Sequence, residues 1–373
     1  MADDAHSTAQ ARRRIAIEAL GRELSNDPTS ASTRLGSMLG EARPMVVSAD
    51  IDGLVSATML GSVAPNFEIA ALSVGSAAWL VHPSVSSGAP SDMFGVDVFS
   101  ANHDNVSNHV IKWGDKKAQL LPVREAFARW DLLVDTMSKS KLLAVPALWA
   151  NTQGGREQAG RPDSSTYKYP FGTAQILLAM LEASGHAPKF FDRTYLPWLV
   201  ANCDGGVSTY ARYAANARVW WPVMAGAIGP GSLTEQIFEL VDTSRPHDFL
   251  DAVHRLDRER PASVPQFLND KWNLMGGTTP SLTVLQHTLT WLTDLTGWRD
   301  PVRGGIPALD QWVMLPPSAS GLVYYTSAGP KGGVAKDDPL LAASLIDGAA
   351  SALNANFYQG GMTGSRFNWV GSW

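Results

Sequence analysis

The chain has 373 residues and a formal net charge of −5 at pH 7, with 17% charged and 45% hydrophobic residues. This balance is typical of a globular chain long enough for about two domains, and it argues against a broadly basic surface that coats nucleic acid. The single cysteine, Cys203, excludes an intramolecular disulfide, and no apolar run is long enough to span a membrane. We therefore expect a cytoplasmic protein without a membrane partner.

The first predicted element is a helix over residues 11–25, where isoleucine, alanine and leucine recur at helical spacing. A polar break over residues 26–32 follows it. On this basis we assign residues 1–40 to an N-terminal helical extension.

Residues 44–60 predict a buried strand, an acidic turn and a helix. Asp50 and Asp52 follow the β-branched residues of the strand, and Gly53 then permits a sharp turn. An open α/β sheet presents ligands at the carboxyl ends of its strands, and paired carboxylates suit Mg²⁺ or Mn²⁺. The alternative is that the two aspartates only cap the following helix.

A second strand is predicted over residues 67–74 and a third over 93–99, with Asp97 near the end of the third. The polar segment directly beyond it contains His103 and Asp104 among several asparagines. Imidazole nitrogens and carboxylate oxygens at this density are typical of a metal site. A polar turn rich in asparagine and aspartate is the alternative.

Two later segments supply further charged candidates. The glycine-rich loop 151–165 contains Arg156, and Lys168 follows it. Such a loop either covers a phosphate or forms mobile surface. Beyond an amphipathic helix predicted over residues 171–183, an apolar segment leads into Asp204, which is another acidic turn after a buried stretch.

The rest of the chain is predicted to be mainly helical. Residues 233–243 are one such helix, and a stripe of leucines over residues 282–295 indicates another. Asp338 followed by proline begins a helix that runs to about residue 356, because aspartate caps a helix and proline fits its first turn. The tail, residues 360–366, is predicted to be a glycine-rich loop that ends at Arg366.

This order of elements favours an α/β fold in which helices flank a mostly parallel sheet, with a smaller α+β domain after it. We place the α/β domain at residues 41–225 and the C-terminal helical and α+β domain at residues 226–373. The boundary follows from the glycines and proline that begin at residue 226.

The acidic turn also resembles a known motif. The pattern Asp50-x-Asp52-Gly53-x-x-Ser56-Ala57 is similar to the first motif of the DHH phosphoesterase superfamily, in which an acidic turn, a glycine and small helical residues have this spacing.

Later residues match that family's motifs in order. Asp97 at a strand end resembles the second motif, and Asp204 resembles the fourth. The His103-Asp104 cluster lies roughly where the Asp-His-His motif is expected. Since the resemblance spans roughly residues 44–210, the chain is identified as a divergent member of the superfamily, and a DHH-like α/β fold is implied.

The resemblance implies metal-dependent hydrolysis of a phosphodiester, in a short oligonucleotide, a cyclic dinucleotide or another small phosphorylated substrate. Bound Mn²⁺ or Mg²⁺ would activate a water molecule and neutralise charge on the transition state. The implied metal ligands are Asp50, Asp52, Asp97, Asp204 and His103. His103 and Asp104 are the implied catalytic residues. The candidates for contacting phosphate oxygens are Arg156, Lys168 and Arg366.

A haloacid-dehalogenase-like phosphatase is one alternative, because its nucleophile motif is also an apolar strand followed by Asp-x-Asp-Gly. In that hypothesis Asp50 attacks phosphorus and Asp52 acts as acid and base. Lys331 or Lys336, together with Asp337, would complete that site.

A catalytically reduced DHH-like subunit of a protein assembly is the other alternative. Ser48 stands where members of the family usually carry histidine or aspartate, and the chain reads Asn102-His103-Asp104 in place of the Asp-His-His triplet. The 13 tryptophans can serve as interface anchors in a homo- or hetero-oligomer, or as ordinary core residues.

Overall fold

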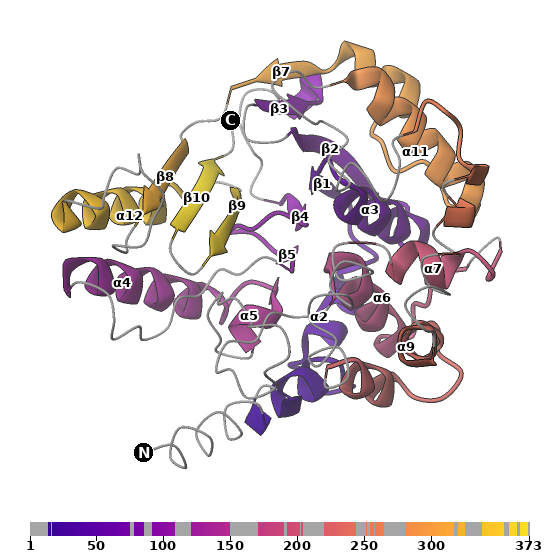
Figure 1. The fold of residues 1–373 in the computed structure, drawn as a ribbon, viewed down its shortest axis with the longest axis horizontal. Helices are drawn as coiled ribbons and strands as arrows, with labels where there is room; N and C mark the ends of the chain where they lie inside the picture. The colour runs from indigo at the N-terminus through magenta and orange to yellow at the C-terminus, as the bar shows by residue number, and fades with distance from the viewer. Residues whose placement is uncertain are drawn as a thin grey trace.

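The computed structural model describes residues 14–15, 17–74, 78–85, 92–108, 121–149, 171–189, 192–201, 203, 220–243, 251, 254–256, 258–264, 281–316, 320–324, 338–353, 358–363 and 366–371. Within them, a seven-stranded mixed sheet forms the centre of the molecule, and a three-stranded antiparallel sheet lies to one side of it (Figure 1).

The main sheet is mostly parallel. Its strands, in spatial order, are β6 (Leu143–Ala144), β5 (Asn105–Val106), β4 (Phe94–Val96), β1 (Arg43–Ser48), β2 (Phe67–Val74), β3 (Ala78–Val81) and β7 (Val313–Leu315). The strands from β6 to β2 pair in parallel, whereas β3 and β7 are antiparallel additions beyond β2. The predicted α/β fold with a mostly parallel sheet is therefore confirmed.

The direction in which strands are added reverses at β1. From β1 the chain passes through helix α3 (Ile51–Val63) to β2 on one side, and it later supplies β4, β5 and β6 on the other side. The carboxyl ends of β1 and β4 therefore flank a topological switch point, which is where open α/β sheets bind ligands.

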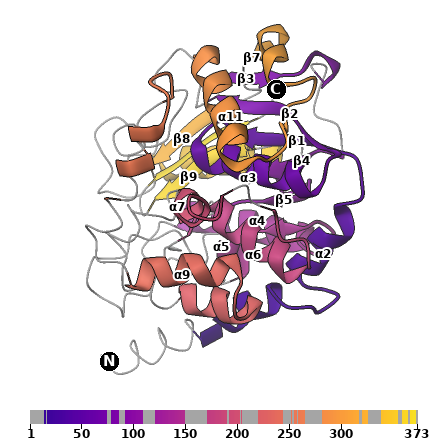
Figure 2. The same cartoon turned by 90° about the vertical axis from the view of Figure 1, so that its right-hand side faces the viewer.

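Helices accompany the sheet, and α3 is the central one. It contacts β1, β2 and β4 as well as two other helices, α6 and α11 (Figure 2). Its residues from Ile51 to Gly61 are all buried, which suits a helix that is apolar on every side. The other helices are α2 (Ala31–Met38), α4 (Leu121–Met137), α5 (Pro146–Trp149), α6 (Thr173–Ala183), α7 (Leu196–Ala201), α9 (Leu233–Thr243), α11 (Leu282–Thr296) and α12 (Pro339–Leu353). None of the described helices is long and apolar enough to cross a membrane.

Strand β1 is buried on both faces. Met45 and Val47 belong to the hydrophobic cluster that includes α3, while Val46 belongs to the cluster on the opposite face with Trp79. This alternation follows from the two-residue period of a strand. Because both faces are covered, β1 is a rigid base for the turn that follows it.

The predicted N-terminal helix is present over residues 17–23, and it buries Leu20 and Leu24 in the main core. The segment packs against the α/β body through these leucines. Glu23 also accepts a hydrogen bond from the N–H of Ala31 at 2.9 Å, at the start of α2.

The second sheet has the order β8 (Ser320–Tyr324), β10 (Arg366–Gly371), β9 (Tyr358–Thr363). Helix α12 contacts β8, β10 and α4, and the ion pair between Arg129 and Asp347 joins α4 to α12 at 2.7 Å (Figure 1). The prediction of a loop over the tail was wrong, because residues 358–363 and 366–371 pair as antiparallel strands.

The main sheet extends past the predicted domain boundary at residue 225. Strand β7 pairs with β3, and Val302 forms a parallel bridge with Ile69 of β2. Helix α11 also contacts α3. Residues 281–316 are therefore built into the same layer as β1 and β2, although the prediction assigned them to the C-terminal domain.

Candidate functional site

The turn after β1 is held by the carboxylate of Asp50. Ser48 Oγ donates to Asp50 Oδ2 at 2.7 Å, and the N–H of Gly53 donates to Asp50 Oδ1 at 2.9 Å. Asp50 is thus the N-cap of α3, as the capping alternative proposed for this residue. A Cβ atom at position 53 would lie 2.2 Å from the carbonyl oxygen of Ser48, so the turn requires glycine there.

Asp52 contacts a different helix. Its side chain is buried, and its two carboxylate oxygens accept the N–H groups of Thr173 and Ala174, each at 2.8 Å. The first N–H groups of a helix lack partners within the helix, so a carboxylate at the start of α6 satisfies two of them and favours its dipole. A Cβ atom at Gly172 would meet Asp52 Oδ2 at 2.5 Å, which makes this close approach depend on glycine.

Asp97 lies at the carboxyl end of β4. It is buried and has a φ of 55°, a left-handed conformation that aspartate adopts more readily than most residues. Thr173 Oγ1 donates to Asp97 Oδ1 at 2.6 Å and accepts the N–H of Asn108 at 2.9 Å. Thr173 therefore binds Asp52 through its backbone and Asp97 through its hydroxyl.

These contacts link two of the predicted residues, Asp52 and Asp97, and the third, Asp50, caps the helix that carries Asp52. Asp50 and Asp52 follow β1, Asp97 follows the adjacent β4, and the start of α6 joins Asp52 to Asp97. Their location is the topological switch point of the sheet. The grouping gathers hard oxygen donors of the kind that Mg²⁺ and Mn²⁺ prefer.

The metal-binding role of these residues stays a prediction. Across the described ranges, no three histidine, cysteine, aspartate or glutamate side chains are arranged to hold a metal ion. The oxygens of Asp50 and Asp52 already accept hydrogen bonds within the protein. Carboxylate oxygens are the donors that a divalent cation prefers, so the chemistry of these residues fits such an ion, with Asp204 predicted to complete the set.

His103 and Asp104 lie toward the other end of the sheet. Asn105 pairs with Gly95, so the two residues before it are level with the start of β4, whereas Asp97 follows its end. His103 is buried, and its Nδ1 lies 2.8 Å from Ser100 Oγ. The loop of residues 97–104 therefore runs from the carboxyl end of β4 back to the level of its first residue.

Asp104 forms a buried ion pair. Its Oδ2 lies 2.7 Å from Nη1 of Arg43, the first residue of β1, and its Oδ1 accepts the N–H of Leu142 at 2.7 Å. A strand rises about 3.3 Å per residue, so the six residues of β1 put roughly 17 Å between this pair and the acidic turn. Burial lowers the pKa of Arg43, but its hydrogen bonds to Glu41 and Asp104 outweigh burial and raise the pKa above its usual value.

The other predicted site residues lie outside the described parts. Asp204, Arg156 and Lys168 fall in ranges that the structure does not describe, as do Lys331, Lys336 and Asp337 of the phosphatase alternative. Arg366 begins β10, and only its backbone is described. Their roles stay predictions.

Sequence reasoning missed Gly172 and Thr173. The helix over residues 171–183 was predicted, but not that its first turn would contact Asp52 and Asp97. A glycine and a threonine at the start of an apolar helix do signal a helix N-terminus. That signal shows where the helix begins and gives no information on the carboxylates, far back in the chain, that its N–H groups meet.

No protein-family model matches the chain, and no curated protein and no solved structure matches it.

Proposed function

We propose that this chain is a metal-dependent phosphoesterase that hydrolyses a phosphodiester in a short oligonucleotide, a cyclic dinucleotide or another small phosphorylated substrate. One observation carries the proposal: carboxylates from the ends of two adjacent parallel strands, β1 and β4, gather at the switch point of the sheet. The resemblance of the acidic turn to the DHH superfamily supports the same chemistry.

In this proposal Asp50, Asp52 and Asp97 hold Mn²⁺ or Mg²⁺, together with the predicted ligand Asp204. His103, which was also predicted as a ligand, lies toward the other end of the strands and is not part of this set. The bound ion would supply an activated water and neutralise charge on the phosphoryl group. Arg156, Lys168 and Arg366 remain the proposed contacts to phosphate oxygens.

The contacts of the carboxylates explain how the chain would position them. Ser48 and the N–H of Gly53 orient Asp50, while Thr173 and Ala174 orient Asp52. Because Asp52 and Asp97 are almost fully buried, their charges act in a medium less polar than water, where attraction to a cation is stronger. Thr173 fixes the position of Asp97 relative to Asp52 through its two bonds.

The test uses Asp50→Asn, because asparagine caps a helix as well as aspartate but lacks the charge. We expect cleavage of bis(p-nitrophenyl) phosphate that requires Mn²⁺, and we expect the variant to lose roughly a hundredfold or more of the rate with its melting temperature nearly unchanged. Asp338→Asn is the matched control, since Asp338 accepts N–H groups at the start of α12 in the same way.

Asp338→Asn should leave the cleavage rate unaltered. Absence of Mn²⁺-dependent cleavage in the wild type, or full activity in Asp50→Asn, would contradict the proposal.

A catalytically reduced subunit is the second candidate, and the bonds of Asp52 favour it. Both of its oxygens accept backbone N–H groups of α6, which is sufficient reason to retain a buried carboxylate without a metal. Calorimetry separates the two candidates. Saturable Mn²⁺ binding that Asp50→Asn weakens supports the hydrolase, whereas no heat of binding, together with a stable complex with another protein, supports the subunit.

A further inference from the structure

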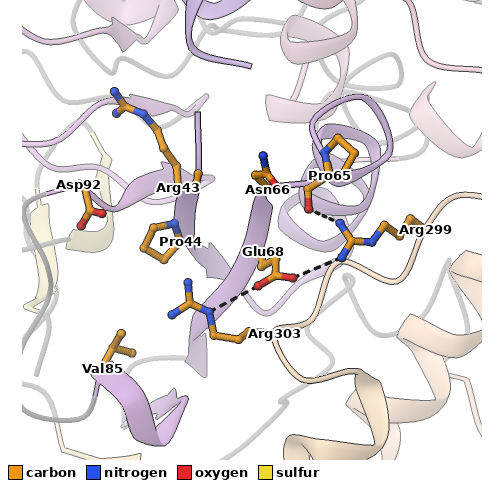
Figure 3. A pocket seen from close by; sticks show the side chains of 10 residues that line it. Arg43, Pro44, Pro65, Asn66, Glu68, Val85, Asp92, Arg299 and Arg303 are labelled. Carbon is orange, nitrogen blue, oxygen red and sulfur yellow. Dashed lines mark hydrogen bonds and ion pairs between the residues drawn. The ribbon is translucent and has the colours of Figure 1, made fainter. Parts of the chain in front are cut away.

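A cavity of about 510 Å³ lies at the amino ends of β1 and β2 (Figure 3). The carboxylate cluster of Asp50, Asp52 and Asp97 follows the opposite, carboxyl ends of β1 and β4. Arg43 and Pro44 begin β1, and Glu68 is the second residue of β2. Arg299 and Arg303 close the cavity from the segment after α11, and Asp92 lines it from the segment before β4. The volume is in the range of pockets that bind small molecules.

The backbone holds the arginine segment firmly. The N–H of Ile69 donates to the carbonyl of Pro301, and the N–H of Arg303 donates to the carbonyl of Ile69 at 3.0 Å. The carboxylate of Asp300 accepts the N–H groups of Val302 and Ile306, each at 2.8 Å. The cavity wall is therefore an extension of the sheet, and the backbone that carries Arg303 is held in place before any ligand arrives.

Glu68 is shared by two of the arginines. Arg299 and Arg303 reach its carboxylate from opposite sides, at 3.3 Å and 3.6 Å (Figure 3). Arg303 Nη1 also donates to Ser84 Oγ at 3.3 Å, and its Nη2 has no partner among the described residues. One carboxylate thus balances two guanidinium groups, which leaves one positive charge in excess on this side of the cavity.

The cavity has two further charged side chains, Arg43 and Asp92. Arg43 is neutralised by Asp104 and Glu41. The carboxylate of Asp92, which lies on the side of Pro44 away from Glu68 in Figure 3, forms no hydrogen bond or ion pair with any residue that the structure describes. Among the residues that the structure describes, the cavity therefore presents one surplus cation and one carboxylate without a cation partner.

We infer that this cavity binds a small zwitterion that carries a carboxylate and an ammonium group. The carboxylate of the ligand pairs with Arg303 and its ammonium pairs with Asp92, while Pro44 and Val85 contact its aliphatic part. A ligand with only negative charge is repelled by Asp92, and a ligand with only positive charge is repelled by the arginines. The site is separate from the carboxylate cluster, and the inference does not depend on the proposed function.

The test measures binding to the full chain by calorimetry and by the shift in melting temperature. The probes are the twenty free α-amino acids, with β-alanine and γ-aminobutyrate to vary the spacing of the two charges. Sodium acetate and inorganic phosphate are the anion-only probes, and methylammonium chloride is the cation-only probe, all at one ionic strength because screening changes charge pairing. We expect saturable binding of at least one zwitterion and none of the single-charge probes.

Two variants locate the site. Asp92→Asn and Arg303→Gln should each weaken binding of that zwitterion by about tenfold or more, the loss typical of a charged hydrogen bond. Asp92→Asn is the more decisive variant, because Asp92 is exposed and bonds to no other residue in the part of the chain that the structure describes. Two control variants should leave binding unchanged, because neither residue lines the cavity: Asp50→Asn, and Arg129→Gln, which breaks an ion pair between α4 and α12.

Three results would overturn the inference: no zwitterion binds at millimolar concentration, acetate or phosphate binds as tightly as the best zwitterion, or binding survives Asp92→Asn.

Discussion

At the scale of single residues, Asp104 illustrates how placement changes the meaning of a residue type. It was predicted to be catalytic because the His103-Asp104 cluster lies roughly where the Asp-His-His motif of the DHH superfamily is expected. In the structure its two oxygens hold Arg43 and the N–H of Leu142, so it joins the start of β1 to the segment before β6. A buried carboxylate with these two bonds stabilises the fold.

We expect Asp104→Asn to lower the free energy of unfolding by about 1–3 kcal/mol, because it removes the charge that balances a mostly buried guanidinium. The Arg43 side chain is 16% exposed and that of Asp104 is 10% exposed. Urea denaturation measures the change. The matched control is Glu41→Gln, since Glu41 pairs with the same arginine but is 54% exposed, and it should cost less than about 1 kcal/mol. Equal losses for the two variants would contradict this account.

His82 gives the molecule a dependence on pH. Burial and the nearby charge of Arg303 lower the pKa of His82 below its usual value, and its ring packs edge-on against Trp312 at 5.6 Å. The unfolded chain, with a histidine pKa of about 6.5, therefore binds more protons than the folded chain in the window below that value. Stability contributed by neutral His82 is complete above about pH 6.5 and is lost as the pH falls through the lowered pKa.

We therefore expect the melting temperature of the wild type to rise with pH between 5 and 7 more steeply than that of His82→Gln. Thermal unfolding across that range measures both slopes. The same substitution at the exposed His254 reports what the loss of a surface histidine does by itself. If His82→Gln follows the wild-type slope, the titration of His82 does not contribute to stability.

At the scale of elements, the start of α6 determines how β1 and β4 meet. Gly172 allows the helix to approach Asp52, and Thr173 then bonds to carboxylates that follow two different strands. The helix dipole and the two carboxylates attract each other, so the position of α6 and that of the acidic turn are coupled. The candidate site is a junction of three elements and not a property of the acidic turn alone.

We expect Thr173→Val to lower the free energy of unfolding by about 1.5–3 kcal/mol, because a buried carboxylate loses a hydrogen bond. Thr58→Val is the matched control. Thr58 is equally buried, but its hydroxyl donates to the neutral carbonyl of Leu54, so the same substitution should cost no more than about 1 kcal/mol. Chemical denaturation of both variants checks the difference, and a Thr58 variant as unstable as the Thr173 variant would refute the argument.

At the scale of the whole molecule, the order of the chain differs from the order of the layers. Residues 281–316 come late in the sequence, yet α11 packs on α3 and β7 extends the sheet from β3. Leu285, Leu289 and Leu292 are fully buried there. The predicted division at residue 225 therefore separates segments that share one core.

We expect a fragment that ends at residue 225 to unfold without a cooperative transition, or at a temperature at least about 10 °C below that of the full chain. Burial of the three leucines of α11 alone contributes roughly 5–9 kcal/mol. A fragment that ends at residue 316 keeps β7 and α11 and should unfold cooperatively. Circular dichroism on heating compares the two, and equal melting temperatures would show that residues 281–316 are dispensable.

Much of the architecture could be predicted because local patterns determine it. Residues 67–74 and 233–243 were predicted with the bounds that the structure has, since a run of β-branched and apolar residues favours a strand and a 3.6-residue period favours a helix. The third strand was predicted too long, because the left-handed backbone of Asp97 follows its end at Val96. The tail was predicted to be a loop because glycine is uncommon in strands, but residues 358–363 and 366–371 form a pair of antiparallel strands.

By itself the sequence determined that a strand, an acidic turn and a helix follow one another over residues 44–60, because β-branched residues, a glycine and an apolar helix are local features. Only the tertiary structure decided that Thr173 bonds to both Asp52 and Asp97, and that His103 and Asp104 lie toward the opposite end of the strands. It also decided that Arg299 and Arg303 form a cavity with the starts of β1 and β2. These outcomes depend on strand order and register, which arise from pairing between segments far apart in the chain and leave no trace in local spacing.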